Sequence, residues 1–382
     1  MKEQELKNVL DNVEISEEIQ NRISEKIQKA YSRKESNYMK SKKKFVITAV
    51  AATLALGITA FAATYMNWSN GFLSSLNISK SQMEKLQNSD NPLVAMPEVS
   101  DAHDGITVST AQCLFDGNVI HLSFYVEGYE LDPAKEPELK HINVLFDGEQ
   151  AYNYDWYFFN GIDWTDRENP VMADGTPVNK DENGNLIPNY RIAGGKMEID
   201  LNLTPVDENG NRISEADLKE KMITVIMRDF GDITGQWTLE WNLGSFEKGT
   251  EFTLNKELGN SNAKVTSAVL YSASAIINYD FPQTVIQSPV LDETGQSVET
   301  SDFAEPPAMV GVKLKDGTIY TDLQNGGTAG YENADTDEFT ARINFSRIID
   351  VDEIDSLLFL KGTNDNAERN ITEDDCYAVT VK

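Results

Sequence analysis

The stretch DGITVSTAQCLFDGNVIHLSFYVEG, residues 104–128, is the clearest guide to the fold of the larger part of this chain. Ile106 and Val108, followed by Cys113 and Phe115, alternate with polar neighbours, and this period of two is typical of a strand with one buried face. The Asp-Gly-Asn sequence at 116–118 predicts a hairpin turn into a second apolar run. We therefore expect an antiparallel pair of strands here.

Similar strand-like segments recur along the rest of the chain and are joined by glycine-containing turns. They are INVLFDGEQAYNYDWYFF (142–159), KMEIDLNLTPV (196–206), MITVIMRDF (222–230), GQWTLEWNL (235–243), AKVTSAVLYSASAIINYDF (263–281), PPAMVGVKLKDGTIYTD (306–322) and CYAVTVK (376–382). Short strands with such turns are typical of β-sandwiches, and 382 residues exceed the usual size of one domain. We therefore expect a mainly β fold with two tandem, immunoglobulin-like β-sandwich domains, at 105–247 and 248–382, preceded by a helix and linker at 67–104.

Upstream of these strands, the segment FVITAVAATLALGITAFAATYM, Phe45–Met66, has 22 residues without a charge or a proline. As a helix it would be about 33 Å long, enough to cross a hydrocarbon core of about 30 Å. Basic residues precede it and aromatic residues suited to a membrane interface end it, which predicts a single-pass protein of the cell membrane with a cytoplasmic N-terminus and an extracellular C-terminus. These topology residues are Lys40, Lys42, Lys43, Lys44, Tyr65 and Trp68.

A cleaved signal peptide is the alternative interpretation of this segment, because Ala60-Phe61-Ala62 resembles a small-x-small cleavage site. A signal peptide normally has a short charged start and an apolar core of about 7–15 residues. Here 44 residues precede an apolar segment of 22. These two mismatches favour an uncleaved anchor.

Charge divides the chain at the predicted anchor. The whole chain has 33 Lys and Arg and 62 Asp and Glu, a net charge of -29. Residues 1–44 hold 11 of the basic and 8 of the acidic side chains, a net of +3, which leaves a net of -32 on the rest. Such a polyanion repels nucleic acid and anionic lipid headgroups, so we expect no nucleic-acid partner.

The predicted cytoplasmic segment, residues 1–44, contains an apolar stripe, because Ile15, Ile19, Ile23 and Ile27 recur every four residues. A single amphipathic helix cannot bury its own stripe, so the stripe lies on the membrane, pairs with itself or docks on another protein. The nearly neutral charge of residues 12–30 disfavours the membrane surface, and we expect a partner helix or groove. A loosely helical tail without a partner is the alternative.

The sequence shows no constellation typical of an enzyme. The HExxH and GxSxG motifs and glycine-rich phosphate loops are absent, the histidines are His103, His121 and His141, and no partner cluster accompanies His121. His121 lies in a strand-like run, where a packed strand residue is the simpler interpretation. We expect no catalytic residue, no cofactor and no metal site. Cys113 and Cys376 leave open either one bridge or two thiols.

Two DENGN segments, at 181–185 and 207–211, resemble the start of a calcium-binding loop. The glycine is fourth rather than sixth, and no bidentate Glu follows at the required distance. Both segments are flanked by polar and then apolar runs, so we interpret them as hairpin turns.

The order of a charged helix, a lysine-flanked anchor and then residues 104–128 resembles the bacterial membrane family named domain of unknown function 4179. The segment GQWTLEWNLGSFEKGTEFTLNKELGNSNAKVTSAVLYSASAIINY, residues 235–279, is similar to the second half of that domain running into a companion β-domain. The resemblance covers about residues 40–280. Proteins of this kind in Gram-positive bacteria are often paired with an extracytoplasmic-function sigma factor, so the resemblance implies an anti-sigma factor.

Two functions follow as hypotheses. In the first, the isoleucine stripe binds a sigma factor, as the resemblance implies, and the outer β-domains sense the envelope or a ligand. The chain lacks the His and Cys residues before the anchor that zinc-type anti-sigma domains need, so its mode of binding differs from theirs. In the second, the chain is a membrane-anchored surface or cell-wall-binding protein with no regulatory tail, since fold alone does not separate the two.

Overall fold

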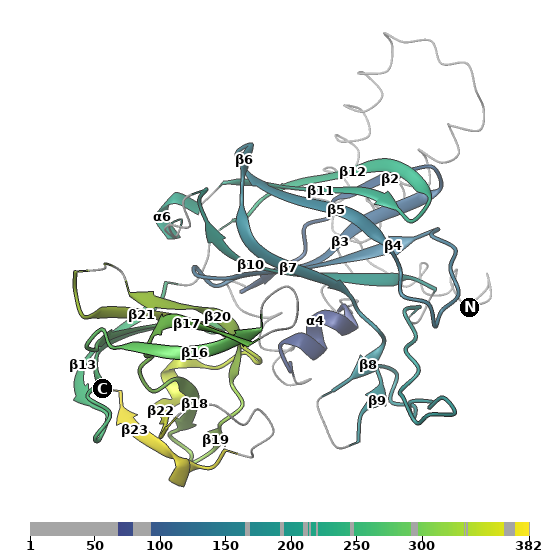
Figure 1. Ribbon diagram of the computed structural model, residues 1–382. Coiled ribbons are helices and arrows are strands. Elements are labelled where there is room, and N and C mark those ends of the chain that lie inside the picture. Colours follow the sequence, from purple (N-terminus) through teal and green to yellow (C-terminus); the bar gives the residue numbers. More distant parts are fainter. Residues whose placement is uncertain are drawn as a thin grey trace, which may run out of the picture. The chain divides into compact units, whose positions relative to one another are not determined.

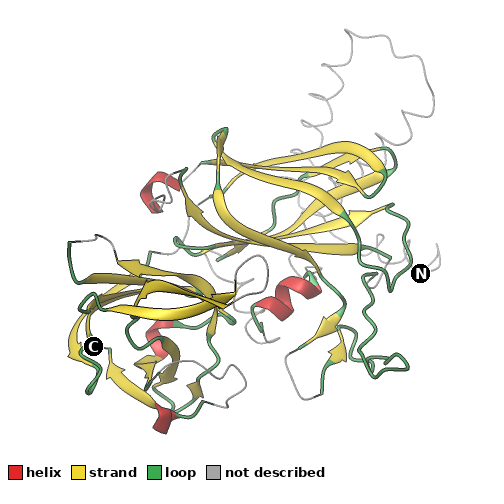
Figure 2. Cartoon of the chain, in the orientation of Figure 1, coloured by secondary structure: helices red, strands yellow, loops and turns green. Residues whose placement is uncertain are grey.

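A computed structural model of the protein describes residues 68–78, 93–164, 169–191, 195–208, 213, 215–218, 221–244, 248–291, 297–331, 333, 335–362 and 371–381. Residues 67–382 form one compact unit (Figure 1). Strands dominate its described part and the helices are short, which confirms the expectation of a mainly β fold (Figure 2).

The predicted anchor, the isoleucine stripe, the four lysines and Tyr65 lie outside the described residues. Among the residues that are described, no helix combines the length and the apolar character needed to cross a membrane. The single-span topology therefore stays a prediction.

The first β-region, residues 93–244, is built from two antiparallel sheets. The larger sheet contains β1 (Val94–Ala95), β2 (Ser100–His103), β3 (Ile106–Phe115), β4 (Ile120–Glu127), β10 (Met197–Val206) and β7 (Tyr152–Phe158), in the order β1-β3-β4-β10-β7 with β2 also paired to β3. The smaller sheet has the order β12 (Ile233–Asn242), β11 (Met222–Phe230), β5 (Leu139–Phe146) and β6 (Glu149–Gln150). A separate hairpin, β8 (Ile162–Asp163) and β9 (Val171–Met172), and the short helix α6 (Glu215–Leu218) complete it.

One hydrophobic core lies between these two sheets. It joins residues such as Phe124 and Leu201 of the larger sheet to Val144 and Val225 of the smaller one. Trp237 is fully buried in it and donates a hydrogen bond from Nε1 to the Ile106 carbonyl oxygen at 3.0 Å. Because a buried indole N–H needs a partner, this bond fixes how β12 meets β3.

The second β-region, residues 248–381, repeats the two-sheet arrangement. Its larger sheet has the order β13 (Thr250–Glu257), β14 (Lys264–Leu270), β15 (Ser274–Asp280), β21 (Glu338–Phe345) and β20 (Gln324–Tyr331). Its smaller sheet has the order β19 (Ile319–Tyr320), β18 (Met309–Leu314), β22 (Ile354–Leu360) and β23 (Cys376–Thr380), and the hairpin β16 (Val285–Leu291) and β17 (Ser297–Phe303) stands apart. Two 3-10 turns are η1 (Val351–Glu353) and η2 (Glu373–Asp375). Tyr279, Phe345 and Phe359 belong to the core shared by the two sheets.

Each region is thus β-sandwich-like, and several local predictions are confirmed. The turn at 116–118 joins the antiparallel strands β3 and β4, and Asp116 Oδ1 accepts hydrogen bonds from the backbone N–H groups of Asn118 and Val119, both at 2.9 Å. Asp181 makes the equivalent turn bonds with the N–H groups of Asn183 and Asn185, so the first DENGN segment is a turn. The second DENGN segment is only partly described. The immunoglobulin-like topology stays a prediction.

Both cysteines are free and buried. Cys113 belongs to the core of the first region, and Cys376 lies in a small cluster of the second region with Val310 and Leu358. The open question between one bridge and two thiols is settled as two thiols.

Candidate functional site: a buried polar face beneath a short helix

The central strands of the larger sheet in the first region are buried on both sides. On one side Leu122 and Ile199 face the core. The other side, which we call the polar face, carries Gln112 of β3, His121, Ser123 and Tyr125 of β4, and Glu198, Asp200 and Asn202 of β10, and it continues onto the edge strand β7 at Asp155 and Tyr157, which are exposed. Alternation in the sequence predicts that such a face is solvated. Instead Ser123 and Glu198 are 0% exposed, and Asp200 and His121 are each 3% exposed.

The helix α4 (Asn70–Ser75) covers one end of the polar face (Figure 1). Its N-cap residue Ser69 accepts a hydrogen bond from the Phe72 N–H through its side-chain oxygen. Polar residues at an N-cap supply an acceptor for N–H groups that have no partner within the helix. The local sequence Ser-Asn-Gly-Phe-Leu therefore starts a helix, and α4 buries Phe72 beneath it.

Glu198 binds the start of α4 through three consecutive residues. Its carboxylate accepts hydrogen bonds from Ser69 Oγ at 3.0 Å, from the Asn70 N–H at 3.0 Å and from the Gly71 N–H at 2.7 Å. The Ser69 N–H is bound separately, by Gln112 Oε1 at 2.8 Å. Burial raises the pKa of the Glu198 carboxyl above its ordinary value, although the bonds from α4 oppose this rise.

Asp200 lies two residues further along β10 on the same face. Neither of its carboxyl oxygens has a hydrogen-bond partner among the described residues. Burial, and to a lesser extent the charge of Glu198, raise the pKa of Asp200 well above its ordinary value. An unpaired buried carboxylate is very unfavourable, so this environment favours the neutral, protonated form.

Gly71 is the point where α4 comes closest to this acid. A Cβ atom at this position would overlap Asp200 Oδ2, so any other residue would force the Asp200 carboxyl to move while the helix is docked. Tyr157 lies opposite Asp200 on the neighbouring strand β7. The pKa of its phenol is raised by burial and by the charges of Asp200 and Asp155, and Ser75 of α4 hydrogen bonds to it. The helix therefore contacts the two buried acids Glu198 and Asp200 in addition to its apolar contact through Phe72.

The other end of the polar face is approached by the second β-region. His121 Nδ1 lies 2.5 Å from Asn202 Oδ1, and Nε2 has no partner among the described residues. Burial lowers the pKa of His121 to about 4, so the ring is neutral near pH 7. Asn344 of β21 donates from Nδ2 to Thr204 Oγ1 at 3.5 Å, which brings the second region to this end of β10.

The turn at 116–118 also joins the two β-regions. Asp116 Oδ2 accepts hydrogen bonds from Ser274 Oγ at 2.8 Å and from the Ala273 N–H at 3.2 Å. Ser274 Oγ in turn accepts a bond from Asn118 Nδ2 at 3.0 Å. Because Asp116 and Ser274 are fully buried, these bonds tie the β3–β4 turn to the start of β15.

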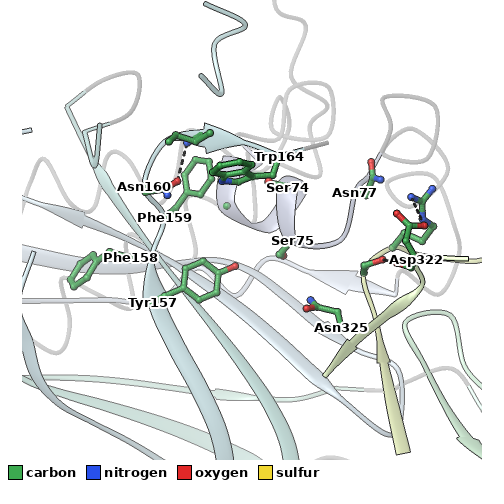
Figure 3. Close-up of a pocket in the computed structure, with 14 residues that line it drawn as sticks. Ser74, Ser75, Asn77, Tyr157, Phe158, Phe159, Asn160, Trp164, Asp322 and Asn325 are labelled. Carbon is green, nitrogen blue, oxygen red and sulfur yellow. Dashed lines mark hydrogen bonds and ion pairs between the residues drawn. The ribbon is translucent and has the colours of Figure 1, made fainter. Parts of the chain in front are cut away.

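A cleft of about 370 Å³ opens beside α4 and is bordered by three parts of the unit (Figure 3). α4 and the residues after it form one border, the end of β7 and the loop into β8 form the second, and the second β-region forms the third. The lining residues are Gly71, Ser74, Ser75, Asn77, Tyr157, Phe158, Phe159, Asn160, Ile162, Trp164, Asp322, Asn325, Ser346 and Arg347.

Of the site residues predicted from sequence, only Trp68 is described. Its side chain is buried, 8% exposed, and its ring lies 5.8 Å from that of Phe72. The side chain thus packs at the start of α4, and the predicted interfacial role is untested. Within the described residues, no group of three or more His, Cys, Asp or Glu side chains is arranged to hold a metal ion.

The polar face was not predicted from the sequence. The pattern Glu198-Ile199-Asp200-Leu201-Asn202 shows a polar side alternating with a core side, but it does not say what covers the polar side. The one available signal was Ser69 and Gly71 just after the predicted anchor, a helix start with a glycine in its first turn.

Comparison with known proteins does not identify the chain. No family model matches it, and no curated protein matches it. One solved structure with some similarity is described as the conserved domain protein from Bacillus anthracis, with 10% identity, coverage of 75% of this chain and 88% of that chain, and a TM-score of 0.37. A likeness of that degree supports no conclusion about fold or function.

Proposed function

We propose that this protein is a single-pass membrane regulator in which the outer β-regions control, through α4, a cytoplasmic segment that binds an extracytoplasmic-function sigma factor. The observation that supports the proposal best is the set of hydrogen bonds that the Glu198 carboxylate accepts from Ser69, Asn70 and Gly71. In sequence, Ser69 follows the predicted anchor, which ends at Met66, by three residues. A change in the β-regions that weakens these hydrogen bonds would therefore act at the outer end of the predicted anchor.

The chemistry of the contact suits a reversible connection. The helix has six residues, which is too short to be stable alone, so its structure depends on the sheet beneath it. It docks on buried carboxyl groups whose proton binding changes with their surroundings. A two-state element of this kind is what a transmembrane signal needs, because each state makes different contacts.

The cytoplasmic half of the proposal rests on the stripe Ile15, Ile19, Ile23 and Ile27 and on the resemblance to the domain of unknown function 4179 family. The experiment is a pull-down with residues 1–44 against any extracytoplasmic-function sigma factor encoded beside this gene, with transcription of its target genes as the cellular measurement. Ile19→Glu with Ile23→Glu places charge in the stripe and should abolish capture and raise transcription. Glu18→Gln with Arg22→Gln, off the stripe, is the matched control and should change neither.

Deletion of residues 1–30 gives the clearest refutation. If it leaves target-gene transcription unchanged, the cytoplasmic segment binds no sigma factor. The alternative, a membrane-anchored surface or wall-binding protein, then gains support, and the specific observation in its favour is the cleft with exposed aromatic rings beside α4. A neighbouring gene for wall synthesis or adhesion would agree with that alternative.

A further inference from the structure

The cleft beside α4 combines exposed aromatic rings with hydrogen-bonding groups. Trp164 is 46% exposed and Tyr157 is 38% exposed, and both belong to the segment that runs from β7 to β8. Figure 3 shows Tyr157 and Trp164 at the cleft together with Ser74 and Asn160. Large aromatic side chains left open to solvent beside a hollow are typical of a ligand-binding surface.

The opposite border comes from the second β-region and is held in place by its own bonds. Arg347 lies 4.2 Å above the centre of the Tyr320 ring and 3.8 Å from an Asp322 carboxylate oxygen. Ser346 Oγ donates to the Asp322 carbonyl oxygen at 2.8 Å. These contacts position a guanidinium and a carboxylate at the cleft, and the Asn325 amide also lines it.

The chemistry of the lining selects a class of ligand. Amide and hydroxyl groups both donate and accept hydrogen bonds, and the one ion pair at the cleft balances its own charge. The net charge of -32 on residues 45–382 repels an anion, and the one carboxylate among the lining residues, Asp322, is already paired with Arg347, so the lining offers no unpaired acid to hold a cation. A neutral ligand that is rich in hydroxyl groups and has an apolar C–H face would use both the rings and the polar groups.

We propose that this cleft binds a neutral saccharide of one or two sugar rings, with one ring face against Trp164 or Tyr157 and its hydroxyl groups bonded to the amides and the Asp322–Arg347 pair. The volume of about 370 Å³ is that of a small-ligand site. Bound sugar touches Ser74 and Ser75 of α4, so it reports on the docking of that helix. The binding stands alone, and only this link to α4 rests on the proposed function.

The test measures binding to the full chain in lipid nanodiscs. Glucose, N-acetylglucosamine, maltose and cellobiose are titrated by isothermal calorimetry and followed by saturation-transfer NMR. We expect saturable binding of at least one of them and an affinity loss of about tenfold in Trp164→Ala. Asn325→Ala, on the other border of the cleft, should weaken the binding of the same sugar.

Tyr152→Ala is the matched control, because Tyr152 is 42% exposed on β7 but does not line the cleft. It should leave the affinity unchanged. The proposal is overturned if none of the four sugars binds or if Trp164→Ala binds them as the wild type does. Far-UV circular dichroism of each variant separates lost binding from lost fold, and the result is independent of whether residues 1–44 capture a sigma factor.

Discussion

The two β-regions handle the outer face of their larger sheet in different ways. In the second region, β14, β15 and β21 present Ser267, Asn278 and Thr340, which bond to one another: Asn278 donates to Ser267 Oγ at 2.9 Å and accepts from Thr340 Oγ1 at 3.0 Å. These three side chains are neutral and satisfy one another. In the first region the outer face of the larger sheet carries Glu198 and Asp200, which are buried and contact α4.

The difference shows where the fold is under electrostatic tension. A satisfied neutral network stabilises a sheet at little cost, whereas a buried carboxyl without a partner is unfavourable and persists only where the surroundings impose it. Such groups concentrate at functional sites. The comparison therefore points to the α4 contact, and away from the outer sheet face of the second region, as the element that changes state.

The largest expected effect is from Glu198→Ala. It leaves the N–H groups of Asn70 and Gly71 and the hydroxyl of Ser69 without their acceptor, and we expect α4 docking to weaken by about 3 kcal/mol or more. Hydrogen exchange at the amides of residues 70–72 is the measurement, and their protection should fall by about 100-fold or more. Glu198→Gln keeps one acceptor oxygen, so its amide protection should lie between that of the wild type and that of Glu198→Ala. Unchanged protection in Glu198→Ala would remove the basis for the α4 connection.

The pH dependence of docking is the second prediction. The pKa values of Glu198 and Asp200 are both raised, so the docked form binds protons more tightly than the undocked form. Docking is then strongest below the ordinary carboxyl pKa of about 4 and weakens as pH rises toward the raised values. Amide protection at residues 70–72, corrected for intrinsic exchange, should therefore fall as pH rises above about 4.

Asp200→Asn is the variant that tests this slope. It removes one of the two titrating acids without changing the shape of the side chain, so α4 docking should become stronger near pH 7, by about 1 kcal/mol, and less dependent on pH. The groups that face the pair are the phenols of Tyr125 and Tyr157, and α4 itself carries no charge. His121 contributes a pH dependence of the opposite sign. Its pKa is lowered in the folded chain, so the unfolded chain binds the proton more tightly and stability falls as pH falls below about 6.5. A slope that survives in Asp200→Asn would show that Asp200 is not its source.

The strands were largely predictable from sequence, and the site was not. Alternation placed Ile106, Leu122 and Trp237 in strands, because a period of two records which side of a strand meets the core. It does not show whether a distant segment also packs on the polar side of the strand. Glu198 and Asp200 have the pattern of a solvated side, and what buries them is a six-residue helix more than 120 positions earlier in the chain. A tertiary contact of that kind leaves no local periodicity.

A substitution in the contact between the two β-regions, at the 116–118 turn and Ser274, should have a smaller effect. Ser274→Ala removes a hydroxyl that bonds Asp116 and Asn118, and we expect a loss of about 1–2 kcal/mol, since a buried carboxylate then loses one donor. Limited proteolysis of residues 244–249, between the regions, should become faster. Ser356→Ala in the second region removes a hydroxyl that is also buried, 4% exposed, and that bonds Asp355 and Thr380 within that region, and it serves as the control. Equal cleavage rates in the two variants would mean that the 116–118 turn does not hold the regions together.

The smallest effect is expected in the neutral network itself. Asn278→Ala breaks the bonds to Ser267 and Thr340, but Asn278 and Ser267 are only partly buried, so water replaces the lost partners and the cost is about 0.5–1 kcal/mol. No carboxyl of the α4 contact is involved, so the effect should be the same at pH 5 and pH 8. Denaturant unfolding of the second region at the two pH values measures it. A loss as large as that of Glu198→Ala, or one that changes with pH, would mean that the two sheet faces do not differ in the way that their bonding indicates. The comparison between them would then give no support to α4 as the switching element.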